Sequence, residues 1–143
     1  MSQMKIIARY RDGRLVKGHT NNFAPHQMMF HIIPIGPEAT GQPVEVRMSE
    51  LKAIFIVRDF AGDPNYQEAQ DPLVPAPGGG RLLQVTFKDR EVLIGRSLEY
   101  SPSGNGFWMF PADPNGNNQR IFVLNAAVDA VEPATSVAAG KAV

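Results

Sequence analysis

The sequence contains no cysteine among its 143 residues. Disulfide bonds, thiolate metal sites and thiol catalysis are therefore excluded, and this composition suits a reducing compartment. Net charge is absent too, because 14 basic side chains balance 14 acidic ones, so no overall field draws the protein to nucleic acid or to a membrane. No apolar run approaches the roughly 20 residues that span a bilayer, and the first residues show no signal-peptide core. We expect a cytoplasmic protein without membrane contact.

The sequence also lacks the short motifs that carry common enzyme chemistry. It has no Gly-x-Ser-x-Gly elbow, P-loop, Rossmann glycine pattern or His-Glu-x-x-His motif. The run Gly78-Gly79-Gly80 is followed by neither a Lys-Ser/Thr pair nor a helix pattern, so it does not indicate a phosphate cradle. The sequence predicts a protein that is not an enzyme and that uses no cofactor.

What the sequence does contain is an internal duplication. A shift of 77 positions places residues 6–18 on residues 83–95 without a gap. The register continues through matched turn and apolar residues, in which Pro25, Phe30, Pro34, Pro37, Gln42, Val46 and Ala53 meet Pro102, Phe107, Pro111, Pro114, Gln119, Val123 and Ala130. A self-match at a fixed period over some fifty residues indicates a duplicated structural unit.

Each copy has the pattern of consecutive short strands. Apolar and polar residues alternate over 6–11, which is the period of a half-buried strand. Asp12-Gly13 predicts a tight type I′ hairpin with two left-handed residues. Gly18 and Gly95 fall in the returning strands, where a strongly bent strand commonly needs a residue without a Cβ. Further strands are expected at 28–33, 44–48 and 52–57, and in the second copy at 107–110, 121–124 and 129–131.

We therefore predict an all-β protein of two tandem SH3/Sm-like five-stranded small barrels related by internal duplication. The first barrel is expected over residues 1–57, an acidic and then Pro/Gly-rich linker over 58–80, the second barrel over 81–132 and a flexible tail over 133–143. A domain near 60 residues buries only about 60% of its chain surface. The two units are thus expected to pack together or to oligomerise.

The second copy resembles the first Sm motif of Sm and Sm-like proteins. The residues that carry this resemblance lie in a strand, turn, strand order: Val85, Phe87, Lys88, Asp89, Val92, Gly95, Leu98 and Tyr100. The resemblance implies a small barrel that forms rings by edge-strand pairing and binds uridine-rich RNA. It places a base-binding residue at Asn105, but the family's Arg-Gly pair before the last strand has no counterpart, so the resemblance supports the barrel more than the RNA pocket.

The whole chain also resembles an uncharacterised bacterial domain family found alongside PilZ and response-regulator modules. The segments 9–13, 57–60 and 110–118 carry this resemblance. It implies a regulatory or signalling setting and no known chemistry. The Arg-x-x-x-Arg spacing of a cyclic-dinucleotide PilZ site is absent from the arginines near the amino terminus.

Basic residues in the first copy form one candidate site. Arg9 and Arg11 share a strand face, and Arg14 and Lys17 follow on the returning side. Such a group can bind a phosphate or carboxylate, because arginine presents a rigid fork of donors. The alternative, which we favour, is a solvated face whose charges protect a strand edge.

The run Phe107-Trp108-Met109-Phe110 is the most hydrophobic in the chain. Alternation directs Phe107 and Met109 into the barrel, so Trp108 and Phe110 face outward. An outward tryptophan needs cover, and the other barrel, the linker or another subunit are the candidates. We expect an interface at Trp108 and Phe110 and regard a stacking platform for bases or sugars as the less favoured interpretation.

Two other polar groups are interpreted as structural. The only histidines, His19, His26 and His31, lack the spacing of a catalytic zinc site and are expected to be ordinary surface or partly buried residues. The segment 113–118 contains one carboxylate and no terminal glutamate, unlike an EF-hand loop. Its Asp-Pro and Asn-Gly pairs predict turns instead. No metal site is expected.

The functional expectation is a non-catalytic protein-interaction or regulatory module of a bacterial signalling system. A protein partner or self-association is expected, and strand addition at an open sheet edge is a physically accessible mechanism. The alternative is a nucleic-acid or nucleotide-binding Sm-like protein that uses Arg9, Arg11, Arg14 and Lys17, with an affinity that falls steeply with salt.

Overall fold

A computed structural model describes residues 4–36, 39–58, 81–97, 100, 103–111, 118–133 and 141–142 of the chain. The predicted linker beyond Arg58, most of the predicted tail and the loop at 112–117 lie outside these residues. The described strands of the first half are β1 (Met4–Tyr10), β2 (Leu15–Thr20), β3 (Met29–Pro34), β4 (Val44–Arg47) and β5 (Leu51–Val57), with a short 3-10 turn η1 (Met48–Glu50) before β5. The prediction of an all-β protein is confirmed.

The second half repeats this order. It contains β6 (Arg81–Phe87), β7 (Val92–Ser97), β8 (Gly106–Pro111), β9 (Asn118–Leu124), the 3-10 turn η2 (Asn125–Ala127) and β10 (Val128–Pro133). A two-residue strand that the sequence did not predict, β11 (Lys141–Ala142), pairs in parallel with β7. In the part of the chain that the structure describes, no helix is long and apolar enough to cross a membrane.

The 77-residue repeat is visible in individual backbone hydrogen bonds. The bond from Tyr10 N to Arg14 O, 2.9 Å long, returns as the bond from Phe87 N to Glu91 O at 2.8 Å. The bonds from Arg11 N to Glu50 O and from Met48 N to Met28 O likewise return 77 positions later: Lys88 N donates to Ala127 O and Asn125 N to Asn105 O. The two halves therefore share a backbone plan as well as a pattern of residue types.

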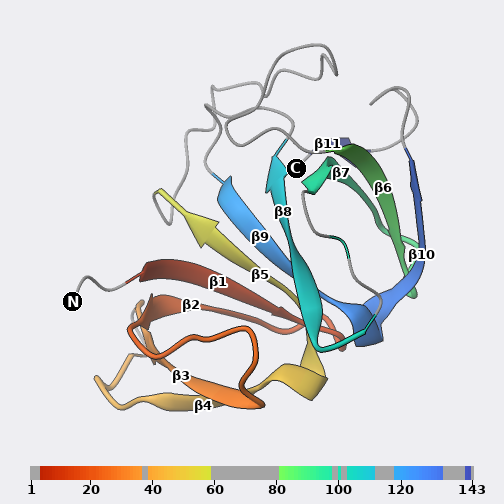
Figure 1. Cartoon of the computed structure of the whole chain (residues 1–143). Coiled ribbons are helices and arrows are strands. Elements are labelled where there is room, and N and C mark those ends of the chain that lie inside the picture. The colour runs from red at the N-terminus through yellow and green to blue at the C-terminus, as the bar shows by residue number, and fades with distance from the viewer. Residues whose placement is uncertain are drawn as a thin grey trace.

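One continuous sheet joins the two halves. Its strand order is β10-β6-β7-β8-β9-β5-β1-β2-β3-β4, so each half contributes five strands in the same order (Figure 1). The joint is the antiparallel pair β5–β9, with Ile54 opposite Phe122 and Phe55 opposite Ile121. The prediction of two separate closed barrels is not confirmed, because β5 pairs with β1 and β9 and not with the β4 of its own half.

Two hydrophobic cores lie on opposite sides of this joint. The first contains Ile6, Phe30, Val46 and their neighbours, and the second contains Val85, Phe107, Met109 and theirs. Side chains alternate along the β5–β9 pair, so that Ile54, Ile56, Phe122 and Leu124 enter the first core while Ala53, Ile121 and Val123 enter the second. The shared pair is buried on both faces, which explains why β5 reads as a nearly unbroken apolar run.

The first hairpin differs from the predicted type I′ turn. Gly13 has a φ of +97°, but Arg90 is the only described residue other than glycine with a positive φ, so Asp12 does not adopt the left-handed conformation. Gly13 N instead donates to Tyr10 O and Tyr10 N to Arg14 O, a three-residue loop that ends in one left-handed residue. Arg90 takes the equivalent position at +79° without the benefit of being glycine.

Gly18 and Gly95 meet a close approach of neighbouring backbone. A Cβ on Gly18 would lie 2.3 Å from Ile33 O, and a Cβ on Gly95 would lie 2.6 Å from Phe110 O. Both contacts are with main chain that cannot rotate away. The predicted requirement for a residue without a Cβ is therefore supported at both positions, and its cause is the close approach of the paired strands β2 and β3 and of β7 and β8.

We expect Gly18→Ala and Gly95→Ala each to lower the free energy of unfolding by about 1–3 kcal/mol, because overpacking forces the backbone apart. Urea denaturation followed by far-ultraviolet circular dichroism measures this effect. Lys17→Ala, at an exposed neighbouring position in β2, is the control and should change stability by less than about 0.5 kcal/mol. Equal stability of the glycine variants and the control would contradict the close approach.

Candidate functional site

An ion cluster centred on the buried Lys52 bridges the two halves beside the β5–β9 joint. Lys52 Nζ lies 2.8 Å from Asp89 Oδ2 and also donates to Glu91 Oε1, and its side chain is only 5% exposed. Arg9 Nη1 lies 3.1 Å from the same Glu91 oxygen. The ammonium also sits 4.7 Å from the centre of the Phe87 ring. Two cations of the first half thus meet two carboxylates of the second half's hairpin.

Local backbone geometry directs Lys52 toward this hairpin. In the pairing of β1 with β5, Tyr10 lies opposite Leu51 and Arg9 opposite Ala53, so Lys52 is the extra residue of a bulge. A bulge re-aims a side chain that regular alternation would place elsewhere. The duplicated bulge in β10 skips Asp129, since Val128 lies opposite Phe87 and Ala130 opposite Thr86. The two halves therefore have the same bulge with opposite charges.

The cluster lowers the pKa of both carboxyl groups. Hydrogen bonding from Lys52 is the main cause for Asp89. For Glu91, burial alone raises the pKa, but the hydrogen bond from Lys52 and the charge of Arg9 together outweigh it and hold the pKa below its ordinary value. Both acids are thus ionised at neutral pH and match the two cations.

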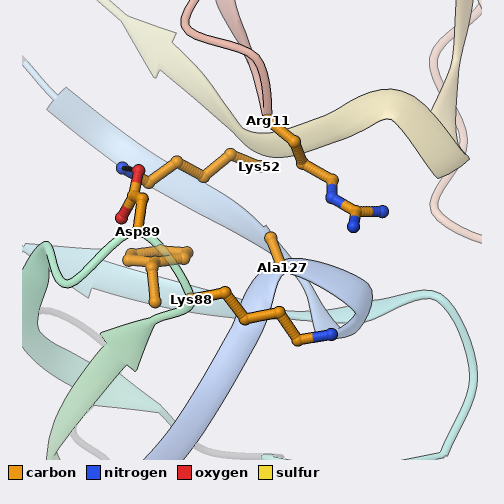
Figure 2. Close-up of a pocket in the computed structure, with 6 residues that line it drawn as sticks. Arg11, Lys52, Lys88, Asp89 and Ala127 are labelled. Carbon is orange, nitrogen blue, oxygen red and sulfur yellow. Dashed lines mark hydrogen bonds and ion pairs between the residues drawn. The ribbon is translucent and has the colours of Figure 1, made fainter.

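A cavity of about 280 Å³ opens beside this cluster at the junction of the halves. Arg11, Lys88 and Ala127 line it together with Lys52, Phe87 and Asp89. Figure 2 shows Lys52 directed at Asp89, whereas Arg11 and Lys88 point away from that pair. Arg11 donates to Ser49 O at 3.3 Å. The cavity holds no group of three ligating side chains, and none occurs elsewhere among the described residues.

The four basic residues of the predicted anion site are not brought together as one free group. Arg9 pairs with Glu91, and Arg14 pairs with Asp12 at 2.8 Å and lies over the Tyr10 ring. Arg11 lines the junction cavity, and Lys17 is exposed on β2. Anion or nucleic-acid binding by this group stays a prediction from the sequence, with its two best donors already engaged by carboxylates.

Trp108 lies at an interface inside the chain. Its ring packs edge-on against Phe122, with centroids 5.2 Å apart, and against Phe23 from the first half, 5.9 Å away. The guanidinium of Arg120 covers it at 4.4 Å. Phe107 and Met109 are buried in the second core, as alternation predicted. Trp108 is therefore covered by Phe23 of the first half and by Phe122 and Arg120 of its own half, while Phe110 is half-buried on the same strand.

The loop before β3 is fixed to the second half by Asn105. Its side-chain amide donates to Pro25 O at 3.0 Å and to Gln27 O at 3.1 Å. Phe23 of this loop also packs on Phe30, with ring centroids 5.1 Å apart. The residue that the Sm resemblance associates with base binding thus serves as a strut between the halves.

His19 and His31 line a hollow on the outer side of β2 and β3. The Nδ2 of Asn22 lies 3.1 Å from His31 Nδ1, and the Oδ1 of Asn22 accepts from His31 N. Both side chains are half-buried.

Exposed large hydrophobic side chains are concentrated in the first half. The large hydrophobic side chains that are exposed among the described residues all lie between positions 15 and 44: Leu15, Met28, Met29, Ile33, Ile35 and Val44. We call these six residues the β2–β4 patch. Three of them, Leu15, Ile35 and Val44, line a hollow of about 380 Å³ together with Lys17 and Pro43.

One member of the patch has a fully buried counterpart in the second half. Ile121, the counterpart of Val44, is fully buried, whereas Val44 is 38% exposed. Phe110, the counterpart of Ile33, is half-buried. Ile121 is buried because its strand, β9, has β5 beside it in the sheet. Val44 stays exposed because β4 ends the sheet and has no further strand beside it among the described residues.

These features define a class of duplicated all-β protein whose two halves are fused through a shared strand pair. Residues 2–134 match the model of a family of unknown function, DUF6982, and the chain belongs to this family. The expectation of an uncharacterised domain family is thereby confirmed. The chain matches no curated protein and no solved structure.

The Lys52 cluster was not predicted from the sequence. Its signal was a single charge, Lys52, within the apolar run Leu51–Val57, combined with the acidic hairpin residues Asp89 and Glu91. A lone charge in such a run indicates either a bulge or a paired charge. Its partners could not be named without the tertiary arrangement.

We expect Lys52→Met to lower the free energy of unfolding at pH 7 by about 1–2 kcal/mol, because two carboxylates lose a buried partner. The pKa of each carboxyl is depressed in the folded state, so the stabilisation is present above their ordinary values of 3.8 and 4.5 and is lost as pH falls through and below them. Urea titrations at pH 7 and near pH 3 should show the gap between wild type and variant shrinking. Lys88→Met is the control, and an unchanged gap at low pH would contradict an ionic origin.

We expect Trp108→Ala to lower the free energy of unfolding by about 3 kcal/mol, as is usual for removal of a packed aromatic ring. Trp108→Phe, which keeps a ring between Phe23 and Phe122, should cost less than half of that. Thermal and urea denaturation by circular dichroism measure both variants, since the chain then lacks its single tryptophan. Full stability of Trp108→Ala together with loss of a binding partner would instead support the intermolecular interface.

Proposed function

We propose that this protein is a non-catalytic protein-interaction module that binds its partner through the β2–β4 patch. The observation that carries the proposal is the uneven exposure of apolar side chains between two halves with the same backbone plan. Exposed large apolar side chains concentrated in one part of a chain are typical of a binding surface. The outer side of β3 offers apolar contact, and the edge of β4 that pairs with no strand among the described residues offers main-chain hydrogen bonds to an extended segment.

Several of the other candidate binding residues already have partners within the chain, which supports the choice of the β2–β4 patch. Arg9 and Arg14 are paired with carboxylates, and Trp108 is covered by Phe23, Phe122 and Arg120. We include two finer expectations in this proposal. The first is that each half is an Sm/SH3-like small barrel opened at the joint, and the second is a bacterial regulatory setting. The five-strand order of each half supports the first, and the sequence resemblance alone supports the second.

The test uses a substitution within the patch. Ile33→Asp places a charge on the outer side of β3, at a side chain 37% exposed, and should abolish capture of the partner. Gln119→Asp adds the same charge at an exposed position of β9 outside the patch and serves as the matched control. The tagged chain is used as bait in a nuclease-treated lysate, and mass spectrometry identifies the proteins captured by each variant. Untagged copies of the chain count as a partner.

The expected result is a partner retained by wild type and Gln119→Asp and lost by Ile33→Asp, with circular dichroism showing all three folded. Retention of the partner by Ile33→Asp would overturn the assignment of the patch. Loss of every bound species on nuclease treatment would favour nucleic-acid binding instead.

A further inference from the structure

The two ends of the sheet are the repeat counterparts of the strands at its centre. Within the chain, β5 of the first half pairs with β9 of the second. Shifted by 77 positions, β5 becomes β10 and β9 corresponds to β4. These two strands lie at opposite ends of the sheet order (Figure 1), and each is paired on one side only in the part of the chain that the structure describes. The two strand edges that pair at the joint therefore occur a second time, on β10 and β4, where neither has a partner among the described residues.

Both ends are incompletely buried relative to the joint. Val44 on β4 is 38% exposed, and its counterpart Ile121 is fully buried. On β10, Val128 and Val131 are half-buried, whereas their counterparts Leu51 and Ile54 are fully buried. The lower burial occurs on β4 and β10, which each have a single neighbouring strand among the described residues, whereas β9 and β5 at the joint each have two. A strand added at either end would remove this difference.

The charges at the two ends are also complementary. At the joint, Lys52 in the bulge of β5 binds Glu91 in the hairpin of the second half. The counterpart of Lys52 is Asp129, and that of Glu91 is Arg14, both exposed; Arg14 pairs within its own hairpin with Asp12, the counterpart of Asp89. The pair is reversed in sign on both sides, so its attraction is preserved when the ends of two different copies meet.

We propose that a second copy of this chain is the partner, and that β10 of one copy pairs antiparallel with β4 of the next. The register of the joint, shifted by 77 positions, sets Ala130 opposite Val46, Val131 opposite Glu45 and Glu132 opposite Val44. Asp129 then approaches Arg14 of the next copy. The inference rests on the proposed function, because it names the partner of the β2–β4 patch.

The contact is heterologous, so each copy keeps one free end and further copies can add. Such contacts produce closed rings when the rotation between copies allows and open chains otherwise. Glu45 and Glu132 replace Phe122 and Phe55 of the joint, which reduces the apolar area of the contact. We therefore expect an association that is reversible and depends on protein concentration, unlike the permanent joint within the chain.

The first experiment exchanges the charges of the reversed pair. Arg14→Glu brings a second carboxylate against Asp129, and Asp129→Lys brings a second cation against Arg14, so each single variant should associate about tenfold more weakly than wild type. The double variant restores an attraction of the kind seen between Lys52 and Glu91 and should recover wild-type association. Sedimentation velocity over a concentration series measures all four proteins, and thermal denaturation checks that each is folded.

The second experiment uses the absence of cysteine from the sequence. Glu132→Cys combined with Val44→Cys places two exposed thiols directly opposite each other in the proposed register, and mild oxidation should produce disulfide-linked multimers. Glu132→Cys combined with Glu45→Cys is the matched control, since neighbouring strand positions point to opposite faces and cannot meet the disulfide geometry.

A chain that stays monomeric at every concentration, or equal crosslinking of the test and control pairs, would overturn the inference. The proposed function would then still stand if a different protein is captured in an Ile33-dependent manner. Failure of the double charge variant to recover association would show that the copies meet elsewhere, and would overturn the β4–β10 contact alone.

Discussion

The antiparallel pairing of β5 with β9 holds the two halves of the protein together. It turns two five-strand units into one sheet, and it provides each core with side chains from the other half. Ile54 and Phe122 complete the first core, and Ala53 and Val123 complete the second. Units of this size bury little surface and are only marginally stable alone. Sharing a strand pair allows each unit to use the apolar area of its neighbour.

The ion cluster beside the joint gives this contact its specificity. A buried ammonium is costly unless it is paired, because the desolvation of the charge must be offset by hydrogen bonds and attraction. Lys52 has these partners only when the Asp89–Glu91 hairpin lies beside the β5 bulge. A register slip along β5 and β9 would leave the charge without its partners, so the cluster favours one alignment of the halves. Asn105 adds a second tie by donating to the loop before β3.

Much of this arrangement was predictable, and the failures have identifiable causes. The period-two alternation and the turn residues predicted most strands, because these signals depend on neighbouring positions. The type I′ turn at Asp12-Gly13 was wrong, since a three-residue loop with Gly13 alone in the left-handed conformation satisfies the same sequence. Arg9 was grouped with Arg11, Arg14 and Lys17 by spacing, but its partner Glu91 is 82 residues away. The outward direction of Trp108 followed from alternation, whereas its cover by Phe23 did not.

Patterns in the amino-acid sequence were enough to establish the all-β class, the duplication and which residues of each strand point inward. These properties are local or periodic, and a shift of 77 positions makes them visible without any knowledge of contacts. How the two halves meet was a matter of tertiary structure, because edge pairing depends on main-chain groups that every strand possesses alike. That pairing determined which side chains have partners: Trp108 packs against the first core and Arg9 pairs with Glu91, whereas the β2–β4 patch is left exposed.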